Sequence, residues 1–333
     1  MNNKTKHNTM PTIDTTNSSS NVSNGEPKKA GIEIDFTTQP TFRYKYVGKC
    51  DLARISENEI LQDIALRIQD GRRLIIPIGL PNSGKSMFIA SLIAYAFRRN
   101  EKEDNSCSFD HVIPKEFSGV KDITDALDGN SVLPSTRKNE FSVIDINMKS
   151  RYRDRKIKVS LLDFAGEDIE RLVGIKPDDD GSARKIEKIL AACIARKAIF
   201  AVISPVDVNL SEIGEVSDFD RKEDTEMKAF IDQIKRNNQR LYLQTKILMV
   251  LTKWDTLPNR INSVTFLKKH RNQLYNEYSS NSKSYGLIPY SVGNVVGDTI
   301  IDIILRSPKN FWYTLYRWCT GKQVLPWWKR IFS

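Results

Sequence analysis

Residues 79–86 constrain this chain more than any other part of its sequence. They read Gly-Leu-Pro-Asn-Ser-Gly-Lys-Ser and match the pattern G-x-x-x-x-G-K-[S/T] at every fixed position. The apolar run Leu74–Ile78 precedes them and the mostly apolar segment Lys85–Arg98 follows, as expected for a strand, a tight turn and a helix. In such a turn the backbone N–H groups and the helix N-terminus face an anion. The sequence therefore predicts a phosphate-binding loop.

The residue types in this loop suit the phosphates of a nucleotide. Lys85 is expected to reach the β- and γ-phosphates, and the hydroxyl of Ser86 is expected to bind Mg²⁺. The glycines permit backbone conformations that other residues avoid. The alternative, a Gly-rich turn without a ligand, fits the flanking strand and helix less well. The predicted binding residues are Gly79, Asn82, Ser83, Gly84, Lys85 and Ser86.

The hydrophobic pattern predicts an α/β fold. Apolar runs alternate with amphipathic helical segments from residue 72 onward, which is typical of a doubly wound, mostly parallel sheet. The runs Phe141–Met148 and Ile157–Leu162 are joined by a short basic turn, so they predict a hairpin that adds one antiparallel edge strand. Farther along the chain, a single helix is expected over Val264–Tyr278.

Two further motifs follow predicted strands. Asp163-Phe164-Ala165-Gly166 comes directly after an alternating strand, so Asp163 is placed to hold Mg²⁺, usually through water, and the Gly166 N–H to meet a γ-phosphate. Thr252-Lys253-Trp254-Asp255 follows the apolar strand Ile247–Leu251. A carboxylate accepts two hydrogen bonds, and guanine offers a ring N–H and an amino group side by side. Asp255 is therefore expected to select guanine, with the stem of Lys253 over the base, although this tetrapeptide taken by itself better fits an ordinary exposed turn at a strand end.

Together, in this order and each after a strand, the three motifs resemble the G1, G3 and G4 boxes of the P-loop GTPases of the translation-factor and Ras-like class. The resemblance covers roughly residues 72–295 and implies a P-loop GTPase fold that binds GTP or GDP with Mg²⁺. It also implies a fifth box at Ser291 and Val292, where Val292 replaces the usual alanine. The second box, a loop threonine that holds Mg²⁺ and the γ-phosphate, is best matched by Thr136, with Ser135 as the alternative and a plain loop threonine equally compatible.

Glu167 departs from the Ras-like pattern, because those enzymes usually have a glutamine there to orient the attacking water. A carboxylate beside a triphosphate suits that role poorly. Lys85, Thr136, Gly166 and Glu167 are the catalytic candidates, and the expectation is slow hydrolysis of GTP to GDP and phosphate, assisted by a protein partner. The long intervals between motifs and the Leu-Pro-x-Thr loop are similar to bacterial double-GTPase families of conflict or defence loci. The function expected is a GTP- and Mg²⁺-dependent molecular switch; the alternatives are a nucleotide-bound scaffold that does not hydrolyse and a P-loop ATPase.

Composition excludes several other classes. Hydrophobic residues make up 40% of the chain, which argues against wholesale disorder. The four cysteines and three histidines are scattered, so a disulfide scaffold, a Cys-rich zinc site or a His-based catalytic site is not expected. No apolar stretch reaches about 18 residues, and the N-terminus lacks the apolar core of a signal peptide. We therefore expect a cytoplasmic protein.

The domain organisation follows from these patterns. Residues 1–30 are expected to form a disordered tail, 31–71 an extension with an amphipathic helix that begins with the capping box Ser56 and Glu59, and 72–305 the GTPase domain. Residues 306–333 form a basic aromatic C-terminal segment without an acidic residue. Interleaved Trp and Lys or Arg suit peripheral contact with the inner face of a membrane, but packing of the aromatic side chains on the domain or on a protein effector is the favoured interpretation. A nucleic-acid partner is not expected.

Overall fold

The computed structural model of the 333-residue chain describes residues 48–98, 106–111, 137–206, 216–237, 244–257, 261–296, 299–303 and 306–324. All of them fall within one compact unit that spans Phe42–Ser333. The N-terminal tail predicted over residues 1–30 lies outside the described residues, as does residue Thr136 of the predicted second box.

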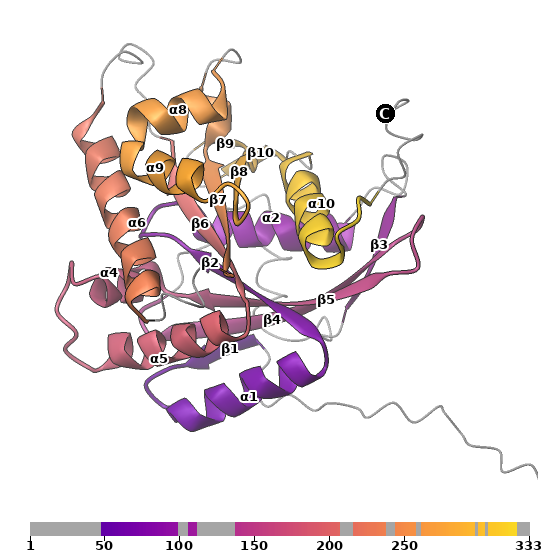
Figure 1. The fold of residues 1–333 in the computed structure, drawn as a ribbon, viewed down its shortest axis with the longest axis horizontal. Coiled ribbons are helices and arrows are strands. Elements are labelled where there is room, and N and C mark those ends of the chain that lie inside the picture. The colour runs from indigo at the N-terminus through magenta and orange to yellow at the C-terminus, as the bar shows by residue number, and fades with distance from the viewer. Residues whose placement is uncertain are drawn as a thin grey trace, which may run out of the picture. The chain divides into compact units, whose positions relative to one another are not determined.

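A mixed sheet organises this unit (Figure 1). Along it the strands run in the order β1-β4-β5-β2-β6-β7-β8, with β3 also paired to β4. The strands are β1 (Gly48–Asp51), β2 (Arg72–Ile78), β3 (Cys107–His111), β4 (Glu140–Ser150), β5 (Lys156–Phe164), β6 (Ile199–Pro205), β7 (Lys246–Thr252) and β8 (Tyr285–Pro289). A separate small hairpin is formed by β9 (Gly293–Val296) and β10 (Thr299–Ile303).

Strands β5, β2, β6, β7 and β8 are parallel, and β4 pairs antiparallel with β5. This confirms the predicted fold class: a mostly parallel sheet with an antiparallel strand toward one edge, supplied by the predicted hairpin. The sequence pattern did not predict β1 and β3, which both pair antiparallel with the outer side of β4. Both are short, so neither carries enough alternation to be recognised.

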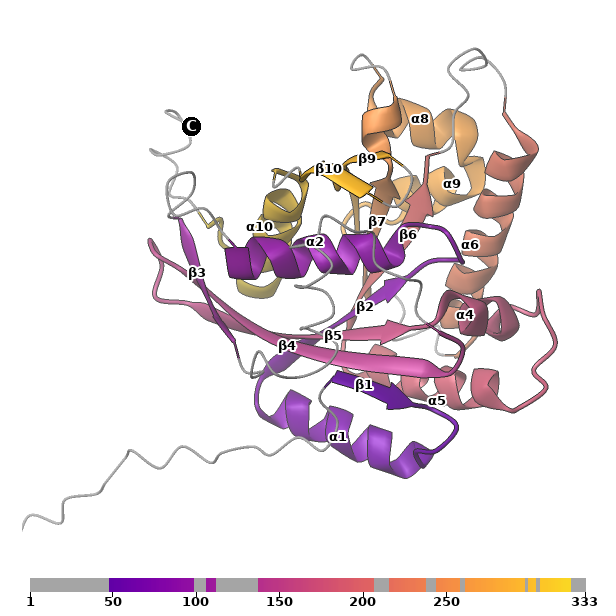
Figure 2. The same cartoon turned by 180° about the vertical axis from the view of Figure 1, so that it is seen from behind.

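Helices cover both faces of the sheet (Figures 1 and 2). They are α1 (Glu57–Gln69), α2 (Lys85–Arg98), α4 (Gly166–Leu172), α5 (Ser182–Ala195), α6 (Asp218–Asn237), α8 (Ser263–His270), α9 (Asn272–Ser280) and α10 (Arg306–Thr320), with a short 3-10 helix η2 (Trp254–Thr256). Within β2, Ile76 and Ile78 join the core shared with α1, α5 and α6, whereas Ile75 joins the core shared with α2 and α10. This alternation places apolar side chains on both faces, as a doubly wound sheet requires. No helix of the described residues is long and apolar enough to cross a bilayer.

Local signals in the sequence are confirmed where they fix a helix end. Ser56 caps α1: its hydroxyl accepts a hydrogen bond from the Glu59 N–H, and the Glu59 carboxylate accepts one from the Ser56 N–H. After α1 the chain turns at Gly71 with φ +76°, a conformation that favours glycine. Strand β2 begins directly after this turn, and the predicted phosphate loop follows the carboxyl end of β2.

The single helix predicted over Val264–Tyr278 is wrong at one residue, because α8 and α9 are separated by Arg271 with φ −137° and ψ +59°. The Arg271 side chain is fully buried. Its guanidinium donates to the Ser204 hydroxyl at 3.2 Å and to the Pro205 carbonyl at 2.9 Å, and it pairs with Asp220. A buried guanidinium needs such partners, and reaching them takes the backbone out of the helix.

Candidate functional site

The predicted phosphate loop is a tight turn between β2 and α2. Gly84 has φ +82° and Asn82 has φ +65°, so two residues adopt the left-handed conformation within a few positions. A Cβ at Gly79 would lie 2.3 Å from the Ser83 Oγ, so the loop closes on itself where that glycine stands. The Ser83 hydroxyl is buried and makes no hydrogen bond among the described residues. A buried, unpartnered hydroxyl inside a turn of N–H groups fits an anionic ligand.

The second motif lies directly against this loop. Gly166 follows β5 and begins α4, and a Cβ there would lie 2.8 Å from the backbone N of Pro81. Only a glycine therefore lets α4 approach the phosphate loop so closely. Asp163, near the end of β5, forms an ion pair with the Lys85 ammonium, which is itself largely buried. The structure thus brings Asp163, Gly166 and Lys85 together, as the motif order predicted.

The third motif holds the phosphate loop from the other side. The Thr252 hydroxyl at the end of β7 donates to the Ser83 carbonyl at 2.7 Å. The next residue, Lys253, has φ +56° and exposes its side chain, and Asp255 is exposed in the short helix η2. No hydrogen bond or ion pair to the Asp255 carboxylate occurs among the described residues, so its two oxygens are available to a ligand. Thr252 therefore fixes the geometry, while Lys253 and Asp255 face outward.

Backbone contacts join the third motif to the predicted fifth box. The Trp254 N–H donates to the Tyr290 carbonyl at 3.2 Å, and the Tyr290 N–H donates to the Leu251 carbonyl at 2.8 Å. The buried Tyr290 hydroxyl lies 2.6 Å from the Ser91 hydroxyl on α2, and burial raises the pKa of Tyr290 far above its usual range. These contacts place Ser291 and Val292 beside the loop of Lys253–Asp255.

The Ser291 N–H is already engaged, because it donates to the Ser307 hydroxyl on α10 at 3.1 Å. The sequence reasoning did not find Ser307 or Ser91, although both link the candidate base-binding loop to neighbouring helices. Neither lies in a motif, and a serine in an amphipathic helix gives no signal of its contact. Only the spatial neighbourhood identifies them.

Glu167 and Asp168, at the start of α4, have opposite environments. The Glu167 side chain is about half exposed and has a distant charge contact with Arg171, 4.0 Å from carboxylate oxygen to guanidinium nitrogen. Asp168 is fully buried and accepts from the Asn139 N–H at 3.1 Å and the Arg171 guanidinium at 2.8 Å. Burial raises the pKa of Asp168, against the lowering effect of these partners. Asp168, which sequence analysis missed, ties α4 to the start of β4.

Oxygen donors for a metal gather at the phosphate loop. Ser86 follows Lys85 in the first turn of α2, and the Asp163 carboxylate contacts that lysine. One hydroxyl and one carboxylate, completed by water and phosphate oxygens, are the donor set that Mg²⁺ prefers. In the described part of the chain, no group of three or more His, Cys, Asp or Glu side chains is placed to hold a metal ion. The site therefore fits a metal that arrives with a phosphate.

The three motifs share one edge of the sheet. The loops after β2, β5, β7 and β8 all leave the carboxyl ends of parallel strands, and the chain reverses its direction of strand addition at β2, between β5 and β6. Open α/β sheets bind ligands at this kind of topological switch point. Of the predicted site residues, only Thr136 and its alternative Ser135 lie outside the described residues.

The described part of the basic aromatic segment packs on the domain. Residues 306–320 form α10, in which Phe311, Trp312 and Tyr316 are fully buried against α2 and the sheet. The Trp312 indole N–H donates to the Leu92 carbonyl at 3.2 Å. Packing on the domain, one of the two expectations, therefore applies to this helix. Tyr313 and Trp318 of the same helix are half-buried, whereas Trp327, Trp328 and Phe332 lie outside the described residues.

Comparison with known proteins gives one family match. Residues 76–188, which contain the first two motifs and the hairpin between them, match the family Double-GTPase 1. A search of curated protein sequences gives no match at a significant level.

Three of the solved structures to which the chain is similar share little sequence identity with it. Toc33 from Arabidopsis thaliana, in complex with GDP and Mg²⁺, is 13% identical over 80% of this chain and 94% of that chain, with a TM-score of 0.39. The SRb-GTP/SRX complex from Chaetomium thermophilum gives 12% identity over 73% and 97%, with a TM-score of 0.36. Roco2 RocCORdC from Methanosarcina barkeri, bound to GDP, gives 13% identity and a TM-score of 0.34. The match covers 75% of this chain but only 49% of the Roco2 chain, about half its length.

Proposed function

We propose that the protein is a GTP- and Mg²⁺-dependent molecular switch, on the premise that residues 76–188 match the family Double-GTPase 1 and lie in a mostly parallel, doubly wound sheet. The observation that carries the proposal is the hydrogen bond from Thr252 to the Ser83 carbonyl. It ties the candidate guanine-binding loop to the phosphate loop. A single ligand with phosphates at one end and a purine at the other fits across the two.

Each candidate residue has a defined part in binding. Backbone N–H groups of Asn82–Ser86 and the start of α2 receive the phosphates, and Lys85 exchanges its partner Asp163 for phosphate oxygens. Ser86 and Asp163 hold the metal, which supplies charge to the phosphate oxygens when it is bound. Asp255 accepts two hydrogen bonds from guanine and Lys253 covers the ring. Because the Ser291 N–H is engaged with Ser307, the Val292 N–H is the donor we assign to the guanine oxygen.

Switching would come from the loops that meet the γ-phosphate. We assign contacts with that phosphate to Thr136 and to the Gly166 N–H, so both loops would be ordered by GTP and released after hydrolysis. Gly166 opens α4 against the phosphate loop, and Asp168 on α4 holds the Asn139 N–H. A movement at Gly166 would therefore also act on the start of β4. This contact supplies a route from the nucleotide to the surface of the hairpin.

Hydrolysis of GTP to GDP and phosphate is proposed to be slow without a partner. The Glu167 carboxylate is half exposed and turned toward Arg171, and a negative group is a poor choice for orienting water beside phosphates. A partner's arginine or lysine would complete the site. The same observation favours the second candidate, a nucleotide-bound scaffold that does not turn over. The free Asp255 carboxylate argues against the third, a P-loop ATPase.

We further propose, from the double-GTPase resemblance, that the switch works in the cytoplasm of a bacterial conflict or defence system through a protein effector. Residues 325–333 retain the sequence character of a membrane-contacting segment, so peripheral contact is proposed for them alone and no longer for α10.

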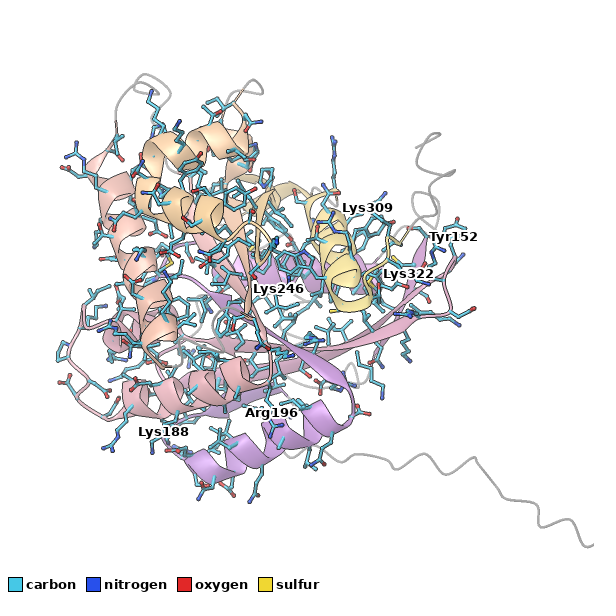
Figure 3. All side chains as sticks on the ribbon, viewed as in Figure 1. Tyr152, Lys188, Arg196, Lys246, Lys309 and Lys322 are labelled. Atoms are coloured by element: carbon cyan, nitrogen blue, oxygen red, sulfur yellow. The ribbon has the colours of Figure 1, made fainter. Side chains whose placement is uncertain are left out.

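Lys85→Ala and Ser86→Ala should each lose most GTP binding in the presence of Mg²⁺ while the fold survives. Each substitution removes charge-assisted or metal-mediated contacts to the triphosphate. We expect the GTP affinity to fall by at least about tenfold as a result. Titration calorimetry with GTP measures the loss, and circular dichroism checks the fold. Lys188→Ala is the matched control, since this lysine is exposed on α5 (Figure 3) and its ion pair among the described residues is with Glu57, at 2.8 Å. Unchanged GTP affinity in Lys85→Ala would remove the assigned phosphate site.

Glu167→Gln should leave the intrinsic GTPase rate unchanged or raise it, because the amide no longer repels the phosphates and can orient water. Single-turnover phosphate release measures the rate. Arg171→Gln is a useful companion, because it removes the cation facing both Glu167 and Asp168. A fast wild-type rate that Glu167→Gln abolishes would make Glu167 a general base and contradict the proposed slow hydrolysis.

A further inference from the structure

A cavity lies at the opposite edge of the sheet from the candidate nucleotide site. It has a volume of about 550 Å³ and is formed by the start of β2, the turn into β5 and the end of α10. From Arg73 near the start of β2 to the phosphate loop after Ile78 is roughly 17 Å along the strand. The cavity is therefore separate from the nucleotide site, and its size falls in the usual range for small-molecule sites.

Cations dominate its walls. The charged side chains that line it are Arg73, Arg155, Lys156 and Lys158 against Asp70 and Asp154. Asp70 is already engaged, because it pairs with Lys158 at 2.5 Å and with Arg72 at 3.2 Å. Asp154 is exposed at the rim. The walls thus offer more positive than negative charge to anything that enters.

Two arginines in this wall are held in place without being neutralised. Arg73 donates to the Lys197 carbonyl at 3.2 Å and lies beside the Cys319 thiol. Arg155 donates to the Thr320 carbonyl at the end of α10, also at 3.2 Å. Neither forms an ion pair with a carboxylate in the described part of the chain. A guanidinium fixed by backbone carbonyls keeps other N–H groups free, in a fork that matches phosphate oxygens.

The surroundings extend this positive field. The amino ends of parallel strands meet at this edge, and further cations lie there: Lys197 before β6, Lys246 at the start of β7, Lys283 before β8, and Arg317 and Lys322 at the end of α10. Figure 3 labels Lys246 and Lys322 beside α10. Charges gathered at a concave site raise the local concentration of anions. The thiol of Cys319 adds no reactivity, because burial raises its pKa and keeps it neutral near pH 7.

We propose that this cavity is a binding site for a phosphate-bearing anion, with Arg73 and Arg155 as its main ligands and Lys156 as a third cation. Polyphosphates and phosphomonoester lipid headgroups share the chemistry that these side chains recognise. The site is distinct from the nucleotide site, and α10 touches both, since Ser307 at its start contacts Ser291 and Thr320 at its end lies in the cavity wall.

The test uses the full chain with its nucleotide site filled by GDP and Mg²⁺, and inorganic tripolyphosphate as the probe in titration calorimetry. Arg73→Gln and Arg155→Gln should each weaken binding by roughly tenfold. Asp154→Asn should strengthen it, because it removes the acid at the rim. Arg184→Gln, on the exposed first turn of α5, is the matched control and should bind as the wild type does. Thermal unfolding and GDP affinity should be unchanged in all four.

Several results would overturn the proposal. They are absence of tripolyphosphate binding at millimolar concentration, binding that survives both Arg73→Gln and Arg155→Gln, or an equal loss in Arg184→Gln, which would indicate a general charge effect. Retained GDP binding in the same samples separates any of these failures from a failure of the proposed nucleotide site.

A second arm identifies the source of the phosphate. Vesicles of phosphatidylcholine with phosphatidic acid are compared with phosphatidylcholine alone in a co-sedimentation assay. Vesicle binding that is lost in Arg73→Gln and displaced by tripolyphosphate supports a lipid headgroup in the cavity. Tripolyphosphate binding without vesicle binding supports a soluble ligand. Vesicle binding that is unaffected by both arginine variants, without tripolyphosphate binding, contradicts the cavity site and points to residues 325–333 instead.

Discussion

Asp255→Asn should reduce GTP affinity by about 10²- to 10⁴-fold and favour xanthosine triphosphate. The carboxylate of Asp255 is exposed and has no partner among the described residues, and guanine presents two donors side by side. Losing two hydrogen bonds to a charged acceptor costs about 3–6 kcal/mol, since each is worth about 1.5–3 kcal/mol. An asparagine offers one acceptor and one donor, which matches xanthine. Competition of GTP, ATP and xanthosine triphosphate for a fluorescent nucleotide measures the change.

The control for this variant is Asp218→Asn, which changes another exposed acid, at the start of α6. It should leave all three affinities unchanged. Wild-type protein should prefer GTP to ATP strongly, because adenine lacks the pair of donors. Equal affinity for ATP and GTP, or an Asp255→Asn variant that retains GTP binding, would mean that the loop after β7 does not read the base.

Trp312→Ala should lower the free energy of unfolding by about 3–5 kcal/mol, the usual cost of emptying a core aromatic site. The ring is fully buried, packs edge-on against Phe109 with centroids 5.2 Å apart, and donates its indole N–H to the Leu92 carbonyl. For a domain of this size the loss corresponds to a fall in Tm of roughly 6–20 °C. Thermal and urea unfolding measure it.

Arg317→Ala on the same helix is exposed and should change stability by less than about 0.5 kcal/mol. This pair of variants also separates the two interpretations of the basic aromatic segment. Packing of α10 predicts that Trp312→Ala unfolds more readily, whereas a membrane role for the helix predicts normal stability with lost vesicle binding. A Trp312→Ala variant as stable as wild type would contradict the packing.

Sequence analysis predicted the parts of the site that depend on local order along the chain. The phosphate loop, the strand before it and the helix Lys85–Arg98 were each identified because strand, turn and helix follow one another within 30 residues. The hairpin of β4 and β5 was found for the same reason. The motif residues Asp163, Thr252 and Asp255 were found because each lies at or just after the carboxyl end of a strand, and the carboxyl ends of parallel strands share one edge.

Sequence patterns could not predict contacts made by unlike partners far apart in the chain. Arg271 interrupts what periodicity marks as one helix, because its guanidinium reaches Ser204 and Asp220. Ser307 holds the Ser291 N–H across a separation of 16 residues and a small hairpin. The sequence around Ser307 or Arg271 does not identify the hydrogen-bond partner of either residue. That partner depends on which segments of the chain meet in the folded protein.

By itself the sequence determined which residues make up the candidate nucleotide site, since glycine, lysine, serine and aspartate stand at a fixed spacing along the chain. The tertiary structure decided the role of the aromatic C-terminal helix. Interleaved Trp, Tyr, Lys and Arg are compatible with both a bilayer surface and a protein core, because both bury rings and leave cations in water. The structure favours the protein core for this helix, because Phe311, Trp312 and Tyr316 pack in one buried cluster with the apolar residues of α2. The cavity lined by Arg73 and Arg155 likewise exists only because three segments distant in sequence end at the same edge of the sheet.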